Sequence, residues 1–141
     1  KVVSETKTLL MDHVRAGIKT VELDHLAENH IRDKGSTPSF KGYRAGGITP
    51  FPSTICISIN EEIVHGIPSE RVLREGDVVS IDIGAIVDGF HADSAFTIGV
   101  GSISNEAKLL VHTTKQSLEK GIAQANGKAY VVCRGTGQFR T

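Results

Sequence analysis

Residues 78–98, VVSIDIGAIVDGFHADSAFTI, hold two aspartates inside a stretch that is otherwise rich in strand-forming residues. Carboxylates are ligands of divalent metal ions, so Asp82 and Asp93 are the first candidates for chemistry. Asp88 and Gly89 stand between the two apolar runs and favour a type I′ turn, because both central residues of that turn need positive φ. The sequence therefore predicts a β-hairpin with one aspartate on each strand.

The turn decides which residues face each other across the hairpin. Asp82 is expected opposite Ala95, and Asp93 opposite Gly84. Side chains alternate between the two faces of a strand, so both aspartates fall on one face as diagonal neighbours, with Cβ atoms about 6–8 Å apart. Two like charges about 6 Å apart repel by roughly 3 kcal/mol at an effective dielectric constant of about 20. That cost is a large share of the net stability of a small domain.

Three things can offset this repulsion: a shared proton, a nearby Lys or Arg, or a metal ion. No Lys or Arg occurs between Arg74 and Lys108, so the hairpin carries no cation of its own. A divalent metal ion is then the leading explanation. The alternative is that one aspartate lies at a frayed, hydrated strand end, or that a β-bulge turns it to the other face.

A histidine precedes the hairpin. Residues 54–65, TICISINEEIVH, alternate isoleucines with smaller polar residues and are read as a strand that runs to His65, where Gly66 and Pro68 end it. One imidazole and two carboxylates at the end of a short sheet are candidates for a single cleft.

Apolar spacing predicts two helices before these strands and one after them. Residues 2–14 form the first helix, and the second begins with Thr20 as N-cap and ends at Gly35. The third begins at Ser104 or Asn105. These residues lie along one side of it: Ala107, Leu110, Val111, Thr114, Leu118 and Ile122.

The order of these elements predicts the fold class. Residues 36–53 are rich in Gly, Pro and Ser and are expected to form a long ordered loop before the first strand. Two helices, then antiparallel strands, then a helix indicate an α+β fold in which helices pack on one face of the sheet.

Composition excludes several classes of protein. The 141 residues are enough for one domain with a core, and 39% hydrophobic and 23% charged residues are ordinary for a globular protein. The formal net charge of zero gives no bulk attraction to nucleic acid or to membranes. No apolar run approaches the roughly 20 residues of a membrane span. Two cysteines cannot form a secreted disulfide framework, so a cytoplasmic location is expected.

Four blocks resemble the type I methionine aminopeptidases: SFKGY, FPSTICISIN, NEEIVHGIP and GDVVSIDIGAIVDGFHADSAFTIGVG. The resemblance runs over residues 1–125. It implies that these residues are the N-terminal half of a pita-bread catalytic domain, in which two related α+β halves enclose a dinuclear metal site. Residues 126–141 depart from the family pattern and stay unassigned.

The resemblance also implies roles for single residues. Asp82 would ligate one metal ion and Asp93 would bridge two, while His65 would contact the substrate near the scissile amide. Cys56 and Phe51 match positions near the pocket for the methionine side chain. The two divalent ions would be Co²⁺, Mn²⁺, Fe²⁺ or Zn²⁺. Ligation dominated by carboxylates is more typical of the first three ions than of a zinc site built from thiolates.

The implied function is removal of the initiator methionine from nascent proteins, with N-terminal Met peptides and the ribosome as partners. Two alternatives remain open, an X-Pro aminopeptidase or prolidase and a non-catalytic peptide-binding module of the same fold. His91 is read as structural, on the face opposite Asp93. The family's remaining ligands, one His and two Glu, belong to its second half, and His112 and Glu119 are read as solvated residues of the third helix.

We therefore expect this chain alone to bind divalent metal weakly and not to hydrolyse Met peptides. Its last residues are read as those of a gene fragment or a frame-shifted end.

Overall fold

The computed structural model describes residues 1–44, 49–125, 132–133 and 139–140, which fall into two compact units, Lys1–Ile103 and Ser104–Thr141. The first unit contains α1 (Val2–His13), α2 (Thr20–Asp33), β1 (Thr37–Pro38), β2 (Ile55–Ile59), β3 (Val78–Val87) and β4 (Phe90–Gly99). The second contains α3 (Asn105–Gln124) and the antiparallel pair β5 (Val132–Cys133) and β6 (Phe139–Arg140). The predicted α+β class is confirmed.

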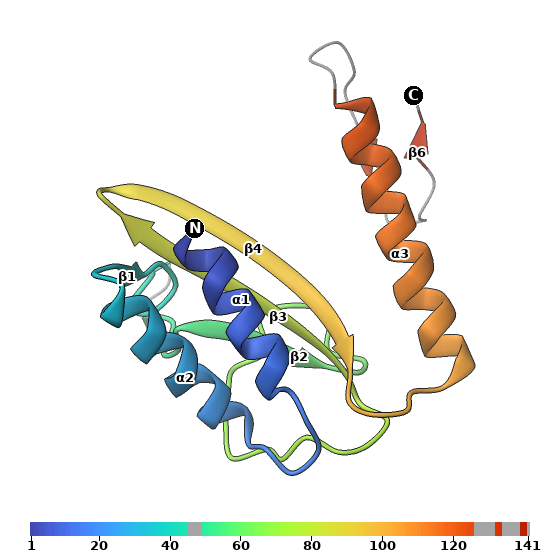
Figure 1. Cartoon of the computed structure of the whole chain (residues 1–141), viewed down its shortest axis with the longest axis horizontal. Coiled ribbons are helices and arrows are strands. Elements are labelled where there is room, and N and C mark those ends of the chain that lie inside the picture. Colours follow the sequence, from blue (N-terminus) through green and yellow to red (C-terminus); the bar gives the residue numbers. More distant parts are fainter. Residues whose placement is uncertain (45–48, 126–131, 134–138, 141) are drawn as a thin grey trace. The chain divides into compact units, whose positions relative to one another are not determined.

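Strand β3 is the centre of the sheet in the first unit. It pairs with β4 along one edge, and β1 and β2 share its other edge, all in antiparallel orientation. Figure 1 shows α1 and α2 side by side, and both helices contact strands of this sheet. The helices therefore cover one face of the sheet and leave the other face for a site.

Alternation along β3 separates the core from that second face. Val79, Ile81 and Ile83 are fully buried, because they point toward the helices and join the hydrophobic cluster. Residues 80, 82 and 84 point the other way. The core side is completed by these residues from the helices, β2, the end of β3 and the loops after β2 and β4: Val3, Leu10, Leu23, Ala27, Ile31, Ile55, Ile57, Ile59, Leu73, Ala85 and Val100.

The hairpin is the one that the sequence predicts. Asp88 has φ +50° and Gly89 has φ +82°, as a type I′ turn requires. The register pairs Asp82 with Ala95 and Gly84 with Asp93. Both aspartates therefore share one face of the β3–β4 ladder.

Strand β2 is shorter than predicted, because it ends at Ile59 and does not run on to His65. Asn60 turns the chain with a φ of +58°, a value that Asn tolerates better than most residues. Its side-chain oxygen accepts a hydrogen bond from the Val78 N–H, and its amide donates to Asp77. This tertiary contact fixes the turn, and a periodic pattern does not reveal it.

The outer edge of β2 is closed by groups that are not strands. The N–H of Ile55 donates to the Asp24 carboxylate, that of Ile57 to the Gly66 carbonyl, and that of Ile59 to the Glu62 carboxylate. A strand with satisfied outward donors does not recruit a further strand. Both α2 and the loop after β2 are thereby fastened to the strand that carries Cys56.

Helix α3 begins as predicted but does not bury its apolar side. Ser104 is the N-cap and accepts a hydrogen bond from the Ala107 N–H. No residue of α3 is buried, and Leu110, Leu118 and Ile122 are all exposed. Apolar spacing shows which side a helix can bury, but it does not supply a surface to cover that side.

Most of the predicted tail, residues 126–141, lies outside the described residues. Within the described part of the chain, no helix has both the length and the apolar character that crossing a membrane requires.

Candidate functional site

A cavity of about 450 Å³ opens on the face of the sheet that the helices leave free. Its lining consists of Phe40, Tyr43, Thr49, Phe51, Cys56, His65, Asp82 and Asp93. All five site residues predicted from the sequence are among these eight. Segments far apart in the chain therefore meet here, since β2, β3, β4 and the loops before and after β2 each contribute.

The sheet supplies the polar floor of the cavity. Cys56 pairs with Asp82 across β2 and β3, and Asp82 in turn pairs with Ala95 on β4. Asp93 pairs with Gly84 across β3 and β4. The two carboxylates come from neighbouring strands of one register-locked ladder, so their relative position follows from the hairpin alone.

The carboxylate of Asp82 lies in surroundings that disfavour its negative charge. Its Oδ1 atom is buried and has no hydrogen-bond partner. Burial raises the pKa of Asp82, and the adjacent Asp93 raises it further, whereas the backbone N–H of Ile83 and the His65 side chain lower it. A buried oxygen without a donor, beside a second carboxylate, is an arrangement that a bound cation stabilises. The two oxygen donors fit a hard divalent metal ion.

His65 reaches the cavity from a loop and not from the end of a strand. Its φ is +60°, a left-handed value that is uncommon for residues other than glycine. The side chain is exposed, as a group that meets a substrate should be. Its influence on the pKa of Asp82 shows that it lies within electrostatic range of that carboxylate.

Cys56 is a wall residue and not a nucleophile in this setting. Burial, followed by the charges of Asp82, Asp93 and Asp24, raises the pKa of the Cys56 thiol to about 11. The reactive form of cysteine is the thiolate, which is scarce at neutral pH with such a pKa. The neutral thiol instead offers a small apolar surface next to the two carboxylates.

Sequence reasoning missed three lining residues, Phe40, Tyr43 and Thr49. Phe40 reaches the site because the Ser39 N–H donates to the Gly84 carbonyl and holds this segment on the sheet. Gly84 makes room for it: a Cβ there would lie 2.6 Å from Phe40 Cε1.

The rest of that wall is held by the loop itself. The Gly42 N–H donates to the Phe51 carbonyl, and the Phe51 N–H donates to the Tyr43 carbonyl. The signal in the sequence was a group of aromatic residues in a loop rich in Gly and Pro. Exposed loops rarely need aromatic side chains.

The face predicted for His91 was wrong. Residues two apart in a strand share a face, and the register pairs His91 with Ile86 and Asp93 with Gly84 on the same side of the ladder. His91 is exposed and does not line the cavity.

His112 and Glu119 are exposed on α3, as predicted. Among the described residues there is no group of three or more His, Cys, Asp or Glu side chains that could hold a metal ion.

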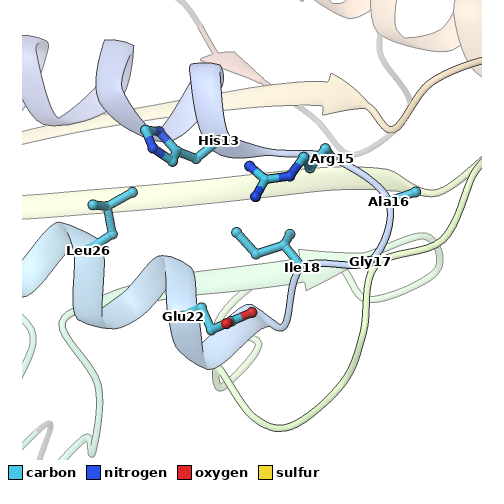
Figure 2. A pocket seen from close by; sticks show the side chains of 7 residues that line it. All are labelled: His13, Arg15, Ala16, Gly17, Ile18, Glu22 and Leu26. Atoms are coloured by element: carbon cyan, nitrogen blue, oxygen red, sulfur yellow. The ribbon is translucent and has the colours of Figure 1, made fainter.

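A second cavity of about 450 Å³ lies between the end of α1 and the start of α2. Figure 2 shows its lining, with the Arg15 guanidinium and the His13 ring on one side and the apolar side chains of Ile18 and Leu26 on the other. Glu22 is its only carboxylate among the described residues, so it lacks the paired acids of the first cavity.

The chain is similar to known metallopeptidases. A model of metallopeptidase family M24 matches residues 1–132. Methionine aminopeptidase 1 of Bacillus subtilis is 49% identical over 125 residues, which are 89% of this chain and 48% of that protein. The crystal structure of methionine aminopeptidase from Rickettsia prowazekii matches with a TM-score of 0.80 at 35% identity, over 86% of this chain and 47% of that one.

A more distant match is the Xaa-Pro dipeptidase from Bacillus anthracis, with a TM-score of 0.71 at 24% identity, over 86% of this chain and 31% of that one. At that identity the likeness shows the fold alone. The chain spans about half the length of the curated relatives that it matches.

Proposed function

The chain belongs to metallopeptidase family M24, and from this membership we propose that it is the part of a methionine aminopeptidase that supplies two carboxylate metal ligands and one wall of the substrate cavity. Residues 1–125 are then the N-terminal half of the catalytic domain. The proposed reaction of the whole protein is hydrolysis of the first peptide bond of nascent proteins, which removes the initiator methionine in the cytoplasm, near the ribosome.

One observation carries the proposal most directly. Asp82 and Asp93 share a face of the β3–β4 ladder, and the buried Oδ1 of Asp82 has no hydrogen-bond partner. In the whole protein, Asp82 would hold one divalent ion and Asp93 would contribute its carboxylate to two. When bound, such ions supply Lewis acidity and lower the pKa of water, which provides a nucleophile near neutral pH.

The remaining residues bind and orient the peptide. We assign His65 as the group that donates a hydrogen bond to the substrate near the scissile amide, because its imidazole lines the same cavity as the aspartates. Phe51 and the neutral thiol of Cys56 form apolar wall, which suits an unbranched thioether side chain. Polar floor and apolar wall together fit an N-terminal methionine.

Metal binding to the 141-residue chain is the first test. Isothermal titration with Mn²⁺ should show weak binding to the wild type that is lost in Asp82→Asn and Asp93→Asn. Asp12→Asn removes an equal charge from an exposed position on α1, outside the cavity, and should bind as the wild type does. Equal affinity in all four proteins would refute the assigned ligands.

Peptide hydrolysis is the second test. We expect no release of methionine from a Met-Ala peptide by the chain alone, because the family resemblance implies three further ligands. Should turnover occur, comparing Met-Ala with Ala-Pro peptides separates methionine removal from X-Pro cleavage. Turnover that survives Asp93→Ala would place the chemistry elsewhere.

A further inference from the structure

The loop that carries His65 is fastened to β2 through the residue that follows it. The Gly66 carbonyl accepts a hydrogen bond of 2.9 Å from the Ile57 N–H, and the Gly66 N–H donates one of 3.1 Å to Ser58 Oγ. The backbone N–H and the carbonyl of Gly66 are therefore both held by consecutive residues of β2. The Ser58 side chain is 4% exposed, so water competes little for this hydroxyl.

The contact leaves no space for any residue larger than glycine. A Cβ at position 66 would overlap the carbonyl oxygen of Ile57 and lie 2.8 Å from its carbon. The backbone of the loop thus lies directly against the backbone of β2. This close approach fixes where the preceding peptide runs, and with it the direction of the His65 side chain.

His65 needs such support because its own backbone conformation is unfavourable. Its φ of +60° is a conformation that a side chain with a Cβ atom rarely adopts without constraint. Without the two bonds to Gly66, the loop is free to relax toward negative φ, which would turn the imidazole away from the cavity.

We propose that Ser58 and Gly66 are positioning residues that hold His65 in its left-handed conformation, so that the imidazole lies in the cavity beside the two aspartates. The proposal rests on the proposed function in one respect, the assignment of His65 as a substrate-contacting group. Ser58 acts through the loop and touches neither substrate nor metal ion.

The sheet offers a matched control for Ser58. Ser80 is its partner across β2 and β3, so it lies on the same face at the same level. Its hydroxyl hydrogen-bonds to Thr97 Oγ1 at 2.8 Å and is not bonded to the loop. Removing one hydroxyl therefore changes the loop, and removing the other changes only the ladder.

Solution NMR of the 141-residue chain tests the proposal. The measured quantities are the hydrogen-exchange rate of the Gly66 amide and the His65 backbone shifts and couplings that report the sign of φ. In Ser58→Ala we expect Gly66 to exchange at least about tenfold faster and the His65 signals to move toward negative φ. Ser80→Ala should leave the Gly66 exchange rate and the His65 signals unchanged. Ser58→Thr keeps a hydroxyl acceptor, so it should give wild-type values of both.

A second substitution covers the case in which Ser58→Ala fails to fold. Ser58→Cys keeps the size of the side chain and replaces the hydroxyl by a weak acceptor, so an intermediate exchange rate at Gly66 is expected. Unchanged His65 signals in folded Ser58→Ala or Ser58→Cys would overturn the proposal.

A Mn²⁺ titration of the same samples keeps the two hypotheses apart. Ser58→Ala should bind Mn²⁺ as the wild type does, because Asp82 and Asp93 are untouched. Absent binding in the wild type would count against the proposed function and not against the positioning role of Ser58 and Gly66. Normal Mn²⁺ binding together with a displaced His65 would support both.

Discussion

Replacing Asp24 with alanine should destabilise the first unit more than substitutions of exposed residues do, because this carboxylate accepts the backbone hydrogen bonds at the start of β2. Asp24 lies on α2 and is 5% exposed. Its Oδ1 accepts hydrogen bonds from the N–H groups of Thr54, at 2.8 Å, and Ile55, at 3.0 Å. These bonds fix the strand one residue before Cys56, which lines the cavity.

The size of the effect follows from the two donors. Alanine leaves both N–H groups buried without their acceptor, and each such loss costs about 1–3 kcal/mol. The expected decrease in the free energy of unfolding is therefore about 2–6 kcal/mol, a large part of the roughly 5–15 kcal/mol of a typical domain. Asp24→Asn keeps an oxygen acceptor and should lose no more than about 1 kcal/mol at pH 7.

The same carboxylate makes stability depend on pH. Burial raises the pKa of Asp24, and the N–H groups of Ile55 and Thr54 oppose that shift only in part. A carboxyl with a raised pKa binds more protons in the folded state, so its contribution is present below the unfolded-state pKa and is lost as pH rises through the folded pKa. The stability of Asp24→Asn relative to wild type should therefore increase as pH rises through this window.

Urea unfolding followed by circular dichroism between about pH 4 and pH 7 measures these differences. The slope of the free energy against urea should stay constant across the three proteins, so that midpoints report stability. Two results would refute the reasoning: an Asp24→Ala protein as stable as wild type, or an Asp24→Asn protein that loses as much as Asp24→Ala. The second result would mean that the charge, and not the acceptor, holds β2.

The other predictions concern the site and the second unit. Asp93→Asn should stabilise the chain in metal-free buffer by up to about 1 kcal/mol, because it removes repulsion at an exposed carboxylate. The same substitution should abolish the rise in melting temperature that Mn²⁺ gives the wild type. A melting temperature below that of the wild type in EDTA would contradict the first expectation. Leu23→Ala should cost about 2–5 kcal/mol because Leu23 is fully buried, whereas Leu118→Ala on α3, where the side chain is 62% exposed, should stay within about 0.5 kcal/mol of wild type. Chemical unfolding measures both leucine variants, and equal losses would mean that α3 buries its apolar side.

The hairpin was predictable because everything that determines it is local. Asp88 and Gly89 select the turn, the turn sets the register, and the register puts Asp82 and Asp93 on one face. A turn that requires two positive φ values admits few sequences, so its signal is strong in a single sequence.

The loop after β2 was not predictable in the same way. Asn60 ends the strand through contacts with Val78 and Asp77, residues that follow much later in the chain. His65 was therefore expected at a strand end and instead lies on a loop that Gly66 fastens to the edge of β2. The aromatic wall at Phe40 has the same origin, since it depends on contact with Gly84 across the sheet.

The two parts of the cavity therefore depend on the fold to different degrees. The carboxylate pair depends on one hairpin, whereas His65 and the aromatic wall depend on loops that are held only by contacts with β2 and β3. A perturbation that loosens those loops and leaves the hairpin intact should weaken peptide binding before it weakens metal binding. Because the metal ligands sit on the more independent part, metal affinity should follow the stability of the β3–β4 ladder and change little when the contacts of the loop are removed.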